Sequence, residues 1–202
     1  MRITDLRPTK HGRMAVYGDG EFLFSLPMEV FAGSQLAVGC EMDGQALEEL
    51  RAQAELKKAK EKALQLLSYK EYTAKQLSDR LARTAGEETA KLAVTRMEEL
   101  GLVDDADYAM RFAHDLYTRK GYGPVRIRQE MRARGIGGEL IEWAMSMLPQ
   151  REAEELALLV KKKYPLAWED ERVRRRAFAA IMRWGYPAQM AYQVLRMQEF
   201  AD

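Results

Sequence analysis

The chain has 202 residues, of which 47% are hydrophobic and 31% charged, a composition typical of a folded protein and not of a disordered one. Its net charge of +1 excludes an overall field that would draw the protein to nucleic acid, so such binding would have to come from local clusters. The single cysteine, Cys40, excludes an intrachain disulfide. With no signal peptide and no apolar run of the roughly 20 residues that a membrane span needs, we expect a cytoplasmic protein with no membrane partner.

Residues 1–52 predict a small β element. Extended segments are expected at residues 3–8, 13–17 and 21–26, and apolar and polar residues alternate in the last of them. The Gly18-Asp19-Gly20 turn before the last segment has the composition of a hairpin turn. A further short strand or turn is expected around residues 40–42. A sheet of this size is too small to be stable alone, so we expect it to pack on the following helix.

From about residue 43 onward, apolar residues recur with the period of an α-helix. The expected helices are 55–69, 73–85, 87–100, 105–120, 124–134, 138–148, 150–163, 170–184 and 188–200. The first is preceded by more helix, either continuous with it or joined to it near Gln53. These helices group in threes, which predicts three-helix repeats at 53–102, 103–149 and 150–202 after the β element at 1–52.

An internal repeat of about 50 residues supports this grouping. The matching positions are Tyr72, Leu77, Leu81 and Gly86 in the first repeat, Tyr122, Ile127, Met131 and Gly135 in the second, and Ala177, Ile181 and Gly185 in the third. Such a period is typical of tandem units that bury their apolar faces against their neighbours. The predicted fold class is therefore mainly α, with three tandem three-helix, helix-turn-helix-like repeats in an elongated array after a small N-terminal β element.

The corner between the first two repeats has the residues of a helix stop followed by a helix start. Gly101 can adopt the left-handed conformation that closes a helix, and Asp104 can cap the next one. Val103 and Tyr108 have the spacing of a hydrophobic staple across that cap. Pro124 suits the first position of a later helix.

The sequence lacks the residue groups of common active sites. The two histidines, His11 in a turn and His114 in a helix, and one cysteine cannot build a usual zinc site. No phosphate-binding glycine loop stands between a strand and a helix, and the aspartates after Asp104 are those of a helix start. We therefore expect no enzymatic activity and no cofactor. The tryptophans, Trp143, Trp168 and Trp184, lie among apolar helical residues and are expected in the core.

Clustered cations are the strongest candidate for a binding site. The residues expected to contact a partner or DNA are Arg119, Lys120, Arg126, Arg128, Arg132, Arg134, Lys162, Arg172, Arg175 and Arg176. Arg128 and Arg132 flank an apolar stripe and have no acidic residue three or four positions away to neutralise them. Recurring in successive repeats, these clusters would suit a long acidic partner or a phosphate backbone. The alternative is a solvated charged face with no ligand.

Three stretches resemble the family of regulatory protein RecX, the modulator of the RecA recombinase. They are EYTAKQLSDRLAR (71–83), LGLVDDADYA (100–109) and RKGYGPVRIRQEMRARGI (119–136), and the similarity extends over about residues 55–202. The resemblance implies a non-enzymatic protein of three three-helix repeats. It also implies binding along the groove of the RecA–DNA filament, with inhibition of ATP hydrolysis, strand exchange and co-protease activity in DNA repair and the SOS response. No motif fixes which side chains make that contact.

Two other functions remain open on the residues alone. A basic helix after a tight turn also occurs in helix-turn-helix proteins, which bind one duplex sequence and are usually dimers. The chain has no dimerisation zipper, so we expect a monomer with at most weak direct binding to single- or double-stranded DNA. The third possibility is a helical scaffold without a nucleic-acid partner.

The tandem arrangement predicts the size of the protein in solution. Three stacked units with helices of about 22 Å, at 1.5 Å per residue, would extend over roughly 60–70 Å. Their radius of gyration would be about 20–22 Å, against roughly 16–17 Å for a compact globule of this length. Small-angle scattering measures this quantity directly, and the smaller value would contradict the tandem arrangement.

Overall fold

The computed structural model describes residues 1–10 and 12–196, so His11 and residues 197–202 lie outside the described structure. The described residues form ten helices and one small three-stranded sheet, which confirms the predicted mainly helical fold. The chain divides into two compact units, Met1–Val103 and Asp104–Asp202, and each is described by itself. The elongated array and the boundaries expected for the repeats stay predictions.

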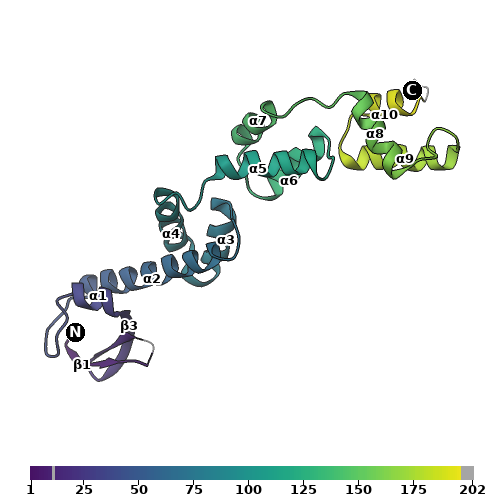
Figure 1. Cartoon of the computed structure of the whole chain (residues 1–202). Helices are drawn as coiled ribbons and strands as arrows, with labels where there is room; N and C mark the ends of the chain where they lie inside the picture. The colour runs from purple at the N-terminus through teal and green to yellow at the C-terminus, as the bar shows by residue number, and fades with distance from the viewer. Residues whose placement is uncertain (11, 197–202) are drawn as a thin grey trace. The chain divides into compact units, whose positions relative to one another are not determined.

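The first unit opens with an antiparallel sheet of strand order β1-β2-β3 (Figure 1). The strands are β1 (Ile3–Pro8), β2 (Arg13–Gly18) and β3 (Glu21–Pro27), close to the three expected segments. The hairpin turn between β2 and β3 has positive φ at both central residues, 49° at Asp19 and 89° at Gly20, as a tight hairpin turn requires. One face of the sheet contributes fully buried Ile3, Val16 and Leu26 to a core with the following helices.

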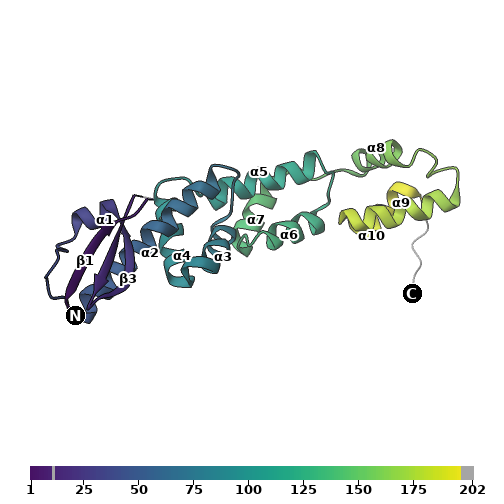
Figure 2. The ribbon, with the colours of Figure 1, turned by 90° about the horizontal axis from the view of Figure 1, so that it is seen from below.

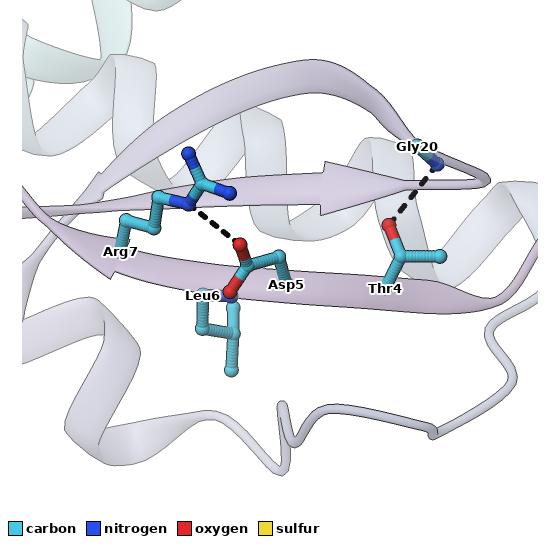
Figure 3. A network of polar contacts seen from close by, with 5 residues as sticks. All are labelled: Thr4, Asp5, Leu6, Arg7 and Gly20. Carbon is cyan, nitrogen blue, oxygen red and sulfur yellow. Dashed lines mark hydrogen bonds and ion pairs between the residues drawn. The ribbon is translucent and has the colours of Figure 1, made fainter.

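Strand β1 is an edge of the sheet, and polar side chains tie it to the neighbouring turn (Figure 3). The amide of Gly20 in the hairpin turn donates a hydrogen bond of 3.1 Å to the Thr4 hydroxyl. The Asp5 carboxylate accepts from the amide of Leu6 at 2.8 Å and also pairs with the Arg7 guanidinium. The bond between Gly20 and Thr4 links the edge strand to the hairpin turn, whereas the contacts of Asp5 lie within β1 itself.

This unit contains one helix that the sequence did not predict, and it shows which of two predicted alternatives is formed. A short helix, α1 (Met28–Gly33), follows β3 directly and was not expected. The next helix, α2 (Gly44–Leu67), is a single continuous helix of 24 residues that begins after an Asp43 cap and runs through Gln53 without a break. Of the two alternatives for this segment, the long helix is therefore the one formed. Residues 40–42, where a short strand or turn was expected, form an isolated bridge between Arg2 and Glu41, flanked by the backbone hydrogen bonds from Ile3 to Cys40 and from Met42 to Met1.

The first three-helix bundle consists of α2 with α3 (Ala74–Ala85) and α4 (Glu87–Glu99), which pack together in Figure 1. Leu77 and Leu81 on α3 are almost completely buried in its core. The closing glycine of α4, Gly101, has φ of +67°, which confirms the left-handed helix stop. Val103 is buried in this same core.

The second unit begins with a bundle of α5 (Asp105–Thr118), α6 (Pro124–Ala133) and α7 (Gly138–Ser146), seen side by side in Figure 2. The Asp104 carboxylate accepts from two amides of the first turn of α5, at 2.9 and 3.0 Å, which confirms the predicted cap. Tyr108 is buried in the core of this bundle. Its pairing with Val103 crosses the division between the units and stays a prediction. Trp143 is 41% exposed, so its expected place in the core is wrong.

The remaining bundle consists of α8 (Ala153–Lys163), α9 (Glu171–Trp184) and α10 (Ala188–Leu195). Ala177 and Ile181 on α9 are fully buried, and Gly185 closes that helix with φ of +86°. The repeat pattern therefore has the same structural meaning here as in the first two bundles. Trp168 is half-buried and donates its indole N–H to the carbonyl of Val194 at 3.1 Å.

A close backbone contact between two glycine-containing turns joins these two bundles within the second unit. The amide of Gly123 donates to the carbonyl of Trp184 at 2.7 Å, and the amide of Val125 donates to the carbonyl of Gly185 at 3.2 Å. A Cβ atom on Gly185 would lie 2.3 Å from the amide nitrogen of Arg126, and one on Gly123 would lie 2.5 Å from the carbonyl oxygen of Gly185. Neither position has room for any side chain. We call this arrangement the glycine contact.

A buried polar cluster lies beside the glycine contact. The Tyr186 hydroxyl donates to the carbonyl of Gly121 at 3.0 Å and accepts from the Arg151 guanidinium at 2.6 Å. The same guanidinium donates to the carbonyl of Tyr117 at 2.9 Å and lies 4.1 Å from the centre of the Tyr117 ring. Burial raises the pKa of Tyr186, because the phenolate form would lose its hydration. These bonds link the start of α8 and the end of α9 to the turn before α6.

We expect Gly185→Ala to destabilise the protein more than Gly101→Ala. Both positions have positive φ, so each substitution costs about 1–2 kcal/mol of backbone strain. The Gly101 position has open space around it, whereas the Gly185 position meets the backbone of α6. Overpacking there should add about 1–3 kcal/mol. Chemical denaturation of both variants measures the difference, and equal losses would contradict the glycine contact.

The buried hydroxyl of Tyr186 predicts a loss of stability at alkaline pH. A group whose folded pKa is raised contributes stability that is present below its unfolded pKa and is lost as the pH rises through the folded pKa. The unfolding free energy should therefore fall from about pH 10 upward, the ordinary pKa of a tyrosine. In Tyr186→Phe this part of the fall should be missing, although the variant also starts from lower stability.

The matched control for this measurement is Tyr69→Phe, because the Tyr69 side chain is 80% exposed. Chemical denaturation at about pH 9 and about pH 11 should give the control the same loss as the unsubstituted protein. A Tyr186→Phe variant that also shows the full loss would contradict the assignment.

Candidate functional site

The candidate site is a cationic cavity in the second unit, formed where α5, α6, α8 and α9 meet around the glycine contact. Its volume is about 570 Å³. The residues lining it are Arg119, Lys120, Tyr122, Arg126, Gln129, Lys163, Met182, Arg183 and Trp184. We call it the junction pocket. It draws residues from two successive three-helix bundles, so neither bundle forms it alone.

Four of the five cations that line the pocket lie at the C-terminal ends of helices, and the fifth, Arg126, lies in the first turn of α6. Arg119 caps the end of α5, and Lys120 precedes Gly121, whose φ of +68° turns the chain toward α6. Lys163 is the last residue of α8, and Arg183 lies in the last turn of α9. Positive side chains are favourable at helix C-termini, where the helix dipole is negative. The helix ends therefore gather positive charge at the mouth of the pocket.

The five cations of the junction pocket differ in their pairing. Arg119 forms an ion pair with Asp115 at 2.9 Å, and Arg126 forms one with Glu130 at 2.5 Å. Lys120, Lys163 and Arg183 are exposed and form no ion pair within the described part of the chain. The pocket therefore carries a surplus of positive charge.

Two aromatic rings complete the lining. The Arg126 guanidinium lies 5.7 Å from the centre of the Tyr122 ring, and the Lys163 ammonium lies 4.7 Å from the centre of the Trp184 ring. Both rings are half-buried. The pocket thus combines cations with flat apolar surfaces, as sites for single-stranded nucleic acids do.

The structure brings three of the ten cations expected from the sequence into this pocket: Arg119, Lys120 and Arg126. It places Arg128 elsewhere. That guanidinium forms a bidentate ion pair with Glu142 of α7, at 2.8 and 2.9 Å, and lies beside a second cavity of about 310 Å³. The hydrogen bonds lower the pKa of Glu142 and raise that of Arg128. Arg128 has no acidic residue three or four positions away, as the sequence shows, but Glu142 of another helix neutralises it.

The other expected cations also lie outside the junction pocket. Arg132 is exposed near Glu142 and helps to lower the pKa of that carboxyl group. Arg134 lies over the Phe112 ring, 4.4 Å from its centre, and donates to the Tyr108 hydroxyl, so packing explains its position.

The expected cations of the last bundle are exposed on α8 and α9. They are Lys162, Arg172, Arg175 and Arg176. Arg175 pairs with Glu171 one turn earlier. None of the four lines the junction pocket.

Sequence reasoning missed several residues of the pocket. Gln129, Lys163, Arg183 and Trp184 were not among the expected site residues, although Lys163 belongs to the run that includes Lys162. Gly185 gave a partial signal, because a helix-closing glycine in the third repeat marks where Arg183 and Trp184 end α9. The approach of that turn to α6 depends on tertiary structure, which no local pattern encodes.

Within residues 1–10 and 12–196, no group of three or more histidine, cysteine, aspartate or glutamate side chains is placed to hold a metal ion. No helix in these ranges combines the length and the apolar character needed to cross a membrane.

Comparison with known families identifies two of the bundles. A family model described as the first three-helix domain of RecX matches residues 59–97. A model described as the second three-helix domain of RecX matches residues 104–145. These ranges fall on the bundles of α2 to α4 and α5 to α7.

Curated relatives of the chain are named regulatory protein RecX. Regulatory protein RecX of Thermus thermophilus is 33% identical over 137 residues, which cover 68% of this chain and 89% of the relative. Regulatory protein RecX of Caldanaerobacter subterraneus subsp. tengcongensis is 32% identical over 165 residues, covering 78% and 81%. The matched regions span only 65% of the relative from Levilactobacillus brevis and 53% of that from Lactobacillus delbrueckii subsp. bulgaricus.

Solved structures share the fold. A crystal structure of regulatory protein RecX aligns with a TM-score of 0.67 at 24% identity, covering 96% of this chain and 98% of that chain. The structure of RecX from Lactobacillus salivarius aligns with a TM-score of 0.61 at 19% identity, covering 70% and 95%. Together with the sequence identity to curated relatives, these matches show that the chain belongs to the RecX family of regulatory proteins.

Proposed function

We propose that the chain binds the RecA–DNA filament and inhibits RecA ATP hydrolysis, strand exchange and co-protease activity, acting as a regulator in the cytoplasm and not as an enzyme. Family membership supports this proposal, because the relatives are named as regulatory proteins and the family models of the first and the second three-helix domain both match this chain. The chain is proposed to act as a monomer, with weak direct binding to DNA alone.

The junction pocket is the observation that carries the proposal. A filament of protein on DNA presents many negative charges, and cations that meet phosphates release bound counterions. The chain has almost no net charge, so attraction to such a partner must come from a local surplus. The exposed cations Lys120, Lys163 and Arg183 supply that surplus at one place.

The structure offers little support for sequence-specific duplex binding through α6. Such a helix would need free side chains that read base edges in the major groove. Two of its arginines are already held by carboxylates, Arg126 by Glu130 and Arg128 by Glu142. Sequence-specific duplex binding is therefore the alternative against which the proposal is tested.

The test is RecA ATPase activity on single-stranded DNA, measured while this protein is added. We expect inhibition at amounts well below one molecule per RecA subunit, because a regulator that binds along or at the end of a filament affects many subunits. No inhibition, together with nanomolar binding to one duplex sequence, would overturn the proposal in favour of the helix-turn-helix function. No effect in either assay would indicate a scaffold.

A matched pair of variants locates the contact. Lys163→Gln/Arg183→Gln removes two charges from the junction pocket, and Arg172→Gln/Arg176→Gln removes two exposed charges from the start of α9. We expect the first variant to need about tenfold more protein for the same inhibition, and the second to resemble the unsubstituted protein. The reverse result would move the contact to α9.

A further inference from the structure

The junction pocket is concave, unlike the exposed cations on the outer surface of α9. Its volume of about 570 Å³ lies within the range of about 300–1,000 Å³ found for pockets that hold drug-sized ligands. One nucleotide is a ligand of that size. The pocket is open to solvent, so one nucleotide unit would fit into it with part of that unit still exposed.

The charge of the pocket calls for an anion. Two of its five cations are compensated by the carboxylates of Asp115 and Glu130. Lys120, Lys163 and Arg183 remain exposed at the rim, without an ion pair in the ranges that the structure describes. Arginine and lysine side chains that converge on one space are suited to phosphate, since each can donate several charge-assisted hydrogen bonds.

The aromatic lining favours a nucleic acid over an acidic protein segment. Tyr122 and Trp184 border the same cavity as the cations. Sites for single strands combine cations that follow the backbone with rings that contact the bases. An acidic peptide would satisfy the cations but has no flat base to lie beside the rings. In a duplex the bases are stacked on one another and closed to such contacts.

We infer that the junction pocket binds one nucleotide of a single DNA strand. Lys120, Lys163 and Arg183 are the phosphate ligands, and Tyr122 and Trp184 lie beside the sugar and base. The identity of the strand as DNA rests on the proposed function, whereas the phosphate chemistry rests on the pocket itself. At this site the regulator would contact the nucleic acid directly, apart from its contacts with RecA.

The inference is tested without RecA, by fluorescence anisotropy of a labelled oligothymidylate with the full chain. Lys163→Gln/Arg183→Gln should weaken binding by about tenfold or more, and Arg172→Gln/Arg176→Gln, with the same change in net charge, by less than about twofold. The logarithm of the binding constant falls linearly with the logarithm of the salt concentration, and in the pocket variant alone this slope should be smaller by about 1.4. That is the value for two lost phosphate contacts on a single strand. Equal losses in both variants would overturn the inference in favour of a general electrostatic effect.

Three competitors test the chemistry of the ligand. A strand of equal length without bases should compete less well than oligothymidylate, and a duplex of equal length should also compete less well. Oligoglutamate of equal charge should be the weakest competitor. Oligoglutamate that competes as well as the strand would overturn the nucleic-acid assignment, and a baseless strand of full affinity would overturn the role of the rings. Circular dichroism melting of each variant confirms that it is folded.

Failure of this inference can be told apart from failure of the proposed function. If the unsubstituted chain inhibits RecA but does not bind the oligonucleotide through the pocket, the function stands and the pocket inference falls. If the chain binds the strand through the pocket but does not affect RecA, the pocket stands and the proposed function falls. Lys120→Gln provides a second, single substitution at an exposed position for the same comparison.

Discussion

The glycine contact determines the architecture of the second unit. Two amide-to-carbonyl hydrogen bonds join the start of α6 to the end of α9, and they form only because Gly123 and Gly185 allow the backbones to approach so closely. The same contact brings the end of α9 beside α6, so that Arg183 and Arg126 line one cavity. Backbone sterics, and not charge attraction, bring the cations together.

Much of this fold could be predicted from the sequence because the signals are local. The left-handed Gly101, the Asp104 cap and the first-position Pro124 each depend on a few neighbouring residues, and the buried faces of the helices follow from their period. The site could not be predicted to the same extent. Glu142 lies 14 residues beyond Arg128 and neutralises it only because α6 packs on α7. The junction pocket likewise depends on a contact between turns more than 60 residues apart in the chain.

Glycines at corresponding positions of the repeats have different structural roles. Gly86, Gly135 and Gly185 occupy corresponding positions and all have positive φ. Gly86 has open space around the place of a Cβ atom, whereas Gly185 faces the backbone of another bundle. The same residue type therefore serves only the local turn in the first bundle and also serves assembly in the third. The sequence pattern indicates the turn that the glycines share. It does not indicate the contact between bundles that Gly185 also makes, and that contact forms the junction pocket.

The continuous helix α2 has a consequence for the cooperativity of the first unit. Ala54 belongs to the core under the sheet, and Ala59 and Ala63, on the same helix, belong to the core of the first three-helix bundle. Both cores therefore include residues of the same continuous helix, α2, with no linker between them. A truncation that removed the β element at residue 52 would cut within this helix, leave it without its Asp43 cap and expose its sheet-side surface to water. The small sheet is thus structurally part of the bundle that follows it, and the two should melt as one body.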